Sequence, residues 1–242
     1  NGVSGGTATD NTTNYTNEYR IGDLADNSQP FTGYITDLRV VKGKAVYTGA
    51  FTPPTAPLTQ TSKTVLLLQP YSKVKKSGSV YKDIDNYNQD EIGGKLIMDH
   101  EIGQKVTDTS PYSKGDDIGS FVFDGLDDRV ILPTISAVGT SDWTLEFWFK
   151  ELTDVSENYS GLVSLSATAD AKRIVSAIHS GTLHFLLNGS WINTSFAPTT
   201  GKWHHVAVSR DKDTRLSMFV DGFQKLNFTG AAKDVDYVTD FD

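Results

Sequence analysis

Cysteine is absent from this chain of 242 residues. Without thiols, the protein can build neither a disulfide scaffold nor a thiolate metal site. An extracellular location is still open, because a domain with a large apolar core does not need disulfides. Long apolar runs are also lacking, and none approaches the ~20 residues that span a bilayer. The sequence therefore predicts no membrane span.

Basic residues are scarce as well. The chain has 22 Lys and Arg against 30 Asp and Glu, for a formal net charge of -8. Proteins that bind nucleic acid need a basic stripe to neutralise phosphates, so we predict no nucleic-acid partner. Neither an initiator Met nor a signal peptide precedes Asn1-Gly2, and we expect the chain to be an interior piece of a longer protein.

What the chain does contain favours strands. Hydrophobic residues make up 38% and aromatic residues 11%, which suffices for a core and suits a pleated surface. Over 143–150, Trp143, Leu145, Phe147 and Phe149 alternate with the polar face of Thr144, Glu146 and Lys150. Residues 202–208 and 216–220 alternate in the same way, and no comparable segment has a helical period. The pattern predicts an all-β, antiparallel β-sandwich.

Short turn motifs separate the expected strands. Asp221-Gly222 and Asn188-Gly189 each lie between strand-like runs and fit two-residue hairpin turns that need positive φ. Ser180-Gly181 is expected to reverse the preceding strand. Residues 173–229 are therefore predicted to form an antiparallel meander of short strands.

A proline-rich segment divides the chain. Residues 51–58 contain three prolines, which remove hydrogen-bond donors and exclude a central strand. A short apolar strand is expected to follow at Thr64–Leu68. These features place a module boundary near residues 59–63.

The motifs on both sides of this boundary resemble one family. Phe31–Val41 is similar to the last strands of concanavalin A-like or laminin-G-like modules, and Ala45–Thr55 is similar to their closing motif in viral and phage surface proteins. Opening and middle motifs of that family follow later in the chain, at 64–68, 119–125, 142–149, 203–208 and 219–222. The resemblance implies a jelly-roll sandwich, commonly found in tandem.

The order of these motifs is rotated, because the closing motif comes before the opening one. We expect residues 1–60 to be the C-terminal strands of a first laminin-G-like module. Residues 64–242 would then be a second module that lacks its last strands. The alternative is one circularly permuted sandwich, in which 1–60 supplies the strands missing from 64–242; in both, unpaired edges must be closed.

No catalytic constellation is visible. Sandwich glycosidases of the laminarinase type carry Glu-x-Asp-x-x-Glu on one strand, and no Glu of this chain has an Asp two positions later. Glu146 stands on its strand without a second carboxylate. Gly2–Gly6 matches the G-x-S-x-G pattern, but no helical pattern follows it, and the motif works only between a strand and a helix. We therefore predict a protein that is not an enzyme, with no catalytic residues.

Two groups of residues could bind metal. Asp124, Asp127 and Asp128 form the densest carboxylate cluster, and oxygen-rich loops suit calcium, which modules of the resembled family often bind. The same aspartates could instead stabilise a turn. His179 and His184 flank a turn and could approach each other, but without a carboxylate nearby in the sequence a metal role is not favoured.

The candidate ligand-binding residues lie around the Asn188-Gly189 turn. Trp191 follows the turn, and an exposed ring of this kind can stack on the apolar face of a sugar. Asn188, Asn193 and Tyr159 are the nearby polar candidates. Trp148, on the polar face of its strand, is a further aromatic ring of interest. In the alternative interpretation, each ring packs under a loop or against a neighbouring module.

These observations predict a non-enzymatic interaction module for adhesion, extracellular or on a virion surface. Its expected partners are a cell-surface glycan or neighbouring structural proteins, within a larger homo-oligomeric assembly. Cofactors are not required, apart from the calcium hypothesis. The alternative is a purely architectural spacer or decoration domain of a viral fibre or capsid, because sandwiches host many functions.

Overall fold

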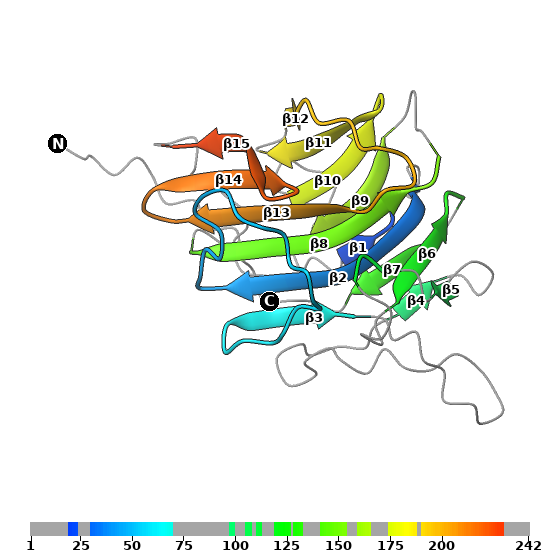
Figure 1. Ribbon diagram of the computed structural model, residues 1–242, viewed down its shortest axis with the longest axis horizontal. Helices are drawn as coiled ribbons and strands as arrows, with labels where there is room; N and C mark the ends of the chain where they lie inside the picture. Colours follow the sequence, from blue (N-terminus) through cyan, green and yellow to red (C-terminus); the bar gives the residue numbers. More distant parts are fainter. Residues whose placement is uncertain are drawn as a thin grey trace, which may run out of the picture.

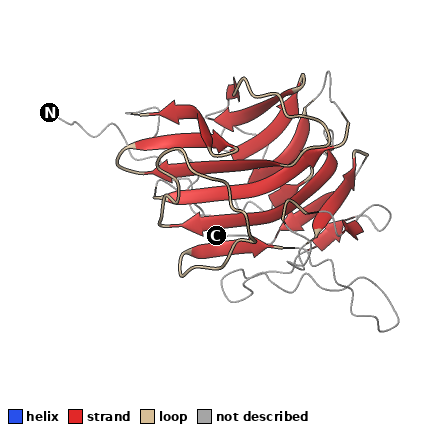
Figure 2. Ribbon diagram, viewed as in Figure 1, coloured by secondary structure: helices blue, strands red, loops and turns tan. Residues whose placement is uncertain are grey.

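The computed structural model describes residues 19–23, 30–69, 97–99, 105–107, 110–112, 119–126, 128–132, 141–153, 159–165, 174–187 and 190–229. Every regular element in these segments is a strand, and the strands form two antiparallel sheets (Figures 1 and 2). The predicted all-β sandwich is confirmed. Within these segments there is also no helix of the kind that crosses a bilayer.

Sheet A has seven strands. Their order in the sheet is β12 (Ser190–Asn193), β11 (Thr182–Leu187), β10 (Ile174–His179), β9 (Ser160–Leu165), β1 (Tyr19–Ile21), β7 (Arg129–Leu132) and β4 (Ile97–Asp99).

Sheet B has eight strands. Seven follow the order β15 (Phe223–Phe228), β14 (Arg215–Val220), β13 (His204–Asp211), β8 (Trp143–Glu151), β2 (Thr32–Lys42), β6 (Ser120–Asp124) and β5 (Lys105–Thr107). The eighth, β3 (Thr64–Leu68), pairs with the second half of β2.

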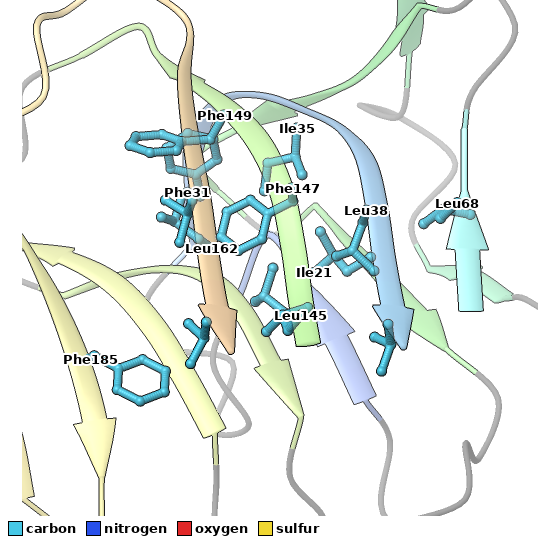
Figure 3. Packing of buried hydrophobic residues seen from close by; sticks show 14 of the residues in the cluster. Ile21, Phe31, Ile35, Leu38, Leu68, Leu145, Phe147, Phe149, Leu162 and Phe185 are labelled. Carbon is cyan, nitrogen blue, oxygen red and sulfur yellow. The ribbon is translucent and has the colours of Figure 1, made fainter. Parts of the chain in front are cut away.

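The core lies between the sheets and is built by the predicted alternation. Trp143, Leu145, Phe147 and Phe149 of β8 are fully buried there. Phe31 meets the edge of Phe149 with ring centroids 6.4 Å apart (Figure 3). Burying a side chain of this size contributes about 1.5–3 kcal/mol, so β8 is a principal source of stability.

The other face of β8 differs from the expectation. We expected Thr144 and Glu146 on a polar face with only the opposite face buried, yet both are fully buried. The reason is a covering layer: the connection between β2 and β3, which we call the strap (residues 43–63), crosses in front of sheet B (Figure 1). No strand occurs in the strap, in agreement with its prolines.

Strand β2 lies in the interior of sheet B. One of its edges pairs with β8, and the other pairs first with β6 and then with β3. Strands from both sides of residues 59–63 therefore contribute to the same two sheets. Without β2, the edges of β8 and β6 would have no partner at this position.

Two of the three predicted turns are confirmed. Asp221-Gly222 joins β14 to β15 with φ of 51° and 80°, and Ser180-Gly181 joins β10 to β11 with φ of 48° and 67°. Asn188-Gly189 lies outside the described residues. The predicted meander of 173–229 is interrupted, because β10–β12 belong to sheet A and β13–β15 to sheet B.

Candidate functional site

The strap is fastened to the outer face of sheet B, the face turned away from the core. The N–H of Val46 donates to Oγ1 of Thr144 at 2.8 Å, and the N–H of Phe51 donates to the carbonyl of Gly222 at 2.9 Å. The Tyr47 ring stacks on Phe51 with centroids 3.6 Å apart. This part of sheet B is therefore closed by the chain itself.

A charged network lies beneath the strap. Oε1 of Glu146 accepts bonds from Nε of Arg39 at 2.9 Å and from Nη2 of Arg39 at 2.5 Å. The hydroxyl of Tyr47, in the strap, donates to Oε2 at 2.6 Å. Nε2 of the fully buried His205 lies 3.4 Å from Oε2, which is long for a hydrogen bond.

The surroundings of Glu146 keep it ionised. Burial by itself raises the pKa of this carboxyl, but His205, the positive charge of Arg39 and the Tyr47 hydroxyl together hold the pKa below its ordinary value. Burial beside Glu146 raises the pKa of Tyr47. Glu146 is therefore a structural acceptor. The sequence did not indicate its partners, because Arg39 and Tyr47 are 107 and 99 residues away in the chain.

A second buried carboxylate anchors the end of the strap. Asp37, with φ of 53°, accepts from the N–H of Leu58 at 2.9 Å, from Nε2 of Gln69 at 2.6 Å and from the Tyr112 hydroxyl. Burial is the largest influence on this group and raises its pKa, although the three donors oppose the change. The donors satisfy a carboxylate that would otherwise be costly to bury.

Trp148 is packed under neighbouring groups. Its ring meets Tyr112 edge-on at 6.1 Å and His205 at 5.1 Å. The half-buried Trp148 therefore corresponds to the interpretation in which the ring packs under a loop.

On the outer face of sheet A, four rings form what we call the aromatic cluster: Tyr159, His179, His184 and Trp191. The Tyr159 ring stacks on both His179 and Trp191. Its centroid lies 3.9 Å from that of His179, with an interplanar angle of 12°, and 4.3 Å from that of Trp191, with an angle of 22°. His184 meets His179 edge-on at 5.3 Å. Tyr159 and Trp191 pack on two buried side chains, Val175 and Leu186. The cluster is a preformed, partly exposed apolar surface.

Three of the four predicted ligand-binding residues come together here. Tyr159 and Trp191 are in contact, and Asn193 lies two residues after Trp191, on the same face of β12. Oδ1 of the exposed Asn193 accepts from the N–H of Ser195 at 2.6 Å, which leaves its amide group to donate. Asn188 lies outside the described residues.

The histidines of the cluster were not among the predicted ligand-binding residues. The sequence did indicate that the two histidines approach each other, since His179 and His184 flank the Ser180-Gly181 turn. In the hairpin, His179 pairs with Thr182, and side chains two residues apart share a face, so His184 lies on the same face as His179. Their approach across the hairpin agrees with the expectation. What the sequence did not show was that Tyr159, from the segment before β9, stacks directly on His179.

The predicted calcium loop contains two described aspartates. Oδ1 of Asp124 accepts from the N–H of Leu126 at 2.8 Å, and Oδ2 of the buried Asp128 accepts from the N–H of Asp124 at 3.0 Å. Asp127 lies outside the described residues. Both visible carboxylates thus stabilise the turn, and no group of three or more metal-binding side chains occurs in the described segments. Calcium binding by Asp124, Asp127 and Asp128 stays a prediction.

Comparison with known proteins agrees with this architecture. Neither the curated proteins nor the solved structures contain a match to the chain. Residues 124–241, just under half of the chain, match the model of the Concanavalin A-like lectin/glucanases superfamily. The matched region covers β7 to β15 and contains the aromatic cluster. The protein therefore has a two-sheet antiparallel sandwich that is consistent with the concanavalin A-like fold, and its second half resembles the domains of that superfamily.

Proposed function

We propose that this protein is a non-enzymatic interaction module that binds glycans through the aromatic cluster, in an adhesive role outside the cell or on a virion. The observation that carries the proposal is the partly exposed Trp191 held against Tyr159, with the exposed Asn193 beside it. Aromatic rings with nearby polar groups are typical of sites that stack on a sugar and bond its hydroxyls.

The stack itself favours binding. One face of Trp191 packs on Tyr159, which is in turn supported by His179, so the indole is fixed before a ligand arrives. A fixed ring loses little side-chain entropy on binding. The remaining surface of Trp191 and the amide of Asn193 are then available to the ligand.

The absence of catalysis is part of the proposal. It is supported by the state of Glu146, the carboxylate at the centre of sheet B, which is fully buried and bonded to Arg39 and Tyr47. A general acid needs a raised pKa and access to substrate, whereas the pKa of Glu146 is lowered.

A glycan-array screen tests the proposal. A multivalent form of the protein is compared with Trp191→Ala and with Phe223→Ala, which removes another exposed ring (68% exposed) on the opposite sheet. We expect bound glycans whose signal falls at least about tenfold in Trp191→Ala and is unchanged in Phe223→Ala. Sugar fragments released from a bound glycan would contradict a purely binding role.

The exposed apolar side chains favour a second candidate, an architectural module that contacts neighbouring proteins. Leu126 and Phe223 are 76% and 68% exposed. Phe223 begins β15 at one edge of sheet B and Leu126 follows β6 near the other edge, so each would be a separate contact point for a neighbouring protein. A screen in which no glycan binds, together with self-association that Phe223→Ala abolishes, would favour this role.

We also propose that the chain is a segment of a tandem array, with residues 1–60 and 64–242 from successive modules. The motif order supports this, because the closing motif at 45–55 comes before the opening motif at 64–68. Strand β2 lies between β8 and β6 of the same chain, as a permuted single module requires, so in an array a neighbouring module would have to supply this strand instead. Linked modules would raise the avidity of weak sites.

A further inference from the structure

We propose a second binding site on the opposite side of the molecule, for a sugar residue that carries a carboxylate. It consists of Tyr34 on β2, Lys150 on β8 and Trp203, the residue just before β13. Tyr34 is paired with Lys150 in the ladder, and Trp203 directly precedes His204, whose partner Phe149 directly precedes Lys150. We call these three residues the lysine row. The proposal does not depend on the aromatic cluster.

The lysine row is an ordered surface. The rings of Tyr34 and Trp203 lie 6.1 Å apart at 47°, and Nζ of Lys150 lies 5.3 Å from the centre of the Tyr34 ring. All three side chains are half-buried, so they are held in place and still reach solvent. The cation–π contact limits the freedom of the long lysine chain before any ligand binds.

Among the described residues, no acidic side chain pairs with Lys150. Arg39, on the same outer face of sheet B, donates to Glu146 through Nε and Nη2 and to the carbonyl of Thr59 through Nη1. Lys150, in contrast, forms no ion pair or hydrogen bond with any residue in the segments that the structure describes. Its ammonium group has three donors, which are therefore available to an anion.

The lysine row also lies beyond the strap. The strap bonds to Thr144 and Glu146, and Phe51 reaches as far as His205, which pairs with Trp148. Lys150 is two residues further along this face of β8. Between the strap and the lysine row, the structure shows neither a hydrogen bond nor an aromatic contact. The strap thus covers the end of the face at Thr144 and Glu146, and the half-buried lysine row lies outside the region that the strap covers.

The chemistry of the lysine row selects the ligand. Two rings offer stacking surface to the apolar face of a pyranose, and one ammonium group between them can pair with one carboxylate. A polyanion such as a sulfated glycan is disfavoured, because the protein carries a net charge of -8 and repels it at long range. A ligand with a single uronate or sialate residue carries one negative charge and is repelled much less. Its short-range pairing with the Lys150 ammonium group then dominates.

Binding measurements with matched ligands test this site. The probes are methyl galacturonoside and sialyllactose, each compared with its own methyl ester, so that the members of a pair differ only in the carboxylate charge and the two pairs separate uronate from sialate. The protein variants are Lys150→Gln, Lys150→Arg and Trp203→Ala, with Lys202→Gln as the control. Lys202 is an exposed lysine next to Trp203, so its loss changes the net charge equally.

We expect at least one acid to bind about tenfold more tightly than its neutral partner, a preference that Lys150→Gln removes and Lys150→Arg keeps. Trp203→Ala weakens both members of the pair, while Lys202→Gln leaves both unchanged. The preference for the acid over its neutral partner persists in Trp191→Ala, which separates this site from the aromatic cluster. The proposal is overturned if neither acid binds, if neutral partners bind equally well, or if Lys202→Gln has the same effect as Lys150→Gln.

Discussion

Arg39 donates two hydrogen bonds to the same carboxylate oxygen of Glu146, and both side chains are almost completely buried. Breaking such a buried pair leaves one charge without compensation. We expect Arg39→Met to lower the free energy of unfolding by about 3–5 kcal/mol, measured by urea denaturation at neutral pH.

The double variant Arg39→Met with Glu146→Leu controls for lost packing. Removing both charges avoids the uncompensated carboxylate, so the double variant is expected to be more stable than Arg39→Met alone. If the two unfold at the same urea concentration, the buried charge is not the source of the loss.

The Glu146 network also makes stability depend on pH. Because the pKa of Glu146 is lower in the folded protein than its ordinary value of 4.5, the ionised form stabilises the fold at pH values above 4.5. This contribution is lost as the pH falls below 4.5 and through the lower, folded value. Glu146→Gln should therefore lose less stability than the wild type between neutral and acidic pH, as measured by denaturation at several pH values. Parallel losses in the two proteins would contradict the assignment.

The turn at Gly222 depends on the absence of a side chain. Gly222 has φ of 80°, and a Cβ there would lie 1.7 Å from the carbonyl oxygen of Phe51 in the strap. Gly201 has the same φ, but a Cβ there would meet nothing within 4 Å. Gly201→Ala should lower the free energy of unfolding by about 1–2 kcal/mol, because only the backbone is strained. Gly222→Ala should cost clearly more, because the strap must also move. Equal melting temperatures for the two variants would contradict this.

Calcium binding by Asp124, Asp127 and Asp128 can be tested by thermal melting. A metal that binds only the folded state raises the melting temperature in proportion to its occupancy. We expect a higher melting temperature in millimolar calcium than in chelator, and no difference in Asp127→Asn. Identical curves for the wild type would mean that these aspartates stabilise only the turn.

The origin of β2 can be tested with a disulfide, since the chain has no cysteine of its own. Tyr34 and Val122 are direct partners in the β2–β6 ladder, where side chains lie about 4.5–5.5 Å apart at Cβ. Tyr34→Cys with Val122→Cys in two tandem copies should give a bond between the copies if a neighbour supplies β2. A bond confined to each copy would support the permuted single module.

The strands were predictable where apolar and polar residues alternate in the sequence, as in β8 and β13. The buried polar face of β8 was not predictable, because alternation shows which residues share a face but not what covers it. The prolines excluded a strand at 51–58 without indicating where the strap would lie. Trp191 and Asn193 were found from one turn, whereas the rings that fix Trp191 come from two other segments. The lysine row could not be predicted from the sequence, because Tyr34, Lys150 and Trp203 are far apart in the chain and come together only when the strands pair.

The interior position of β2 has a consequence for how the molecule folds. Strand β2 pairs with β8, which lies more than 100 residues later in the chain. During synthesis, β2 and β3 emerge long before β8 is made, so the edge of β2 that pairs with β8 remains unpaired until then. Closing such long loops is slow, and exposed strand edges favour aggregation in the meantime. The rate at which the finished sandwich forms is therefore expected to be set by the docking of β2 against β8.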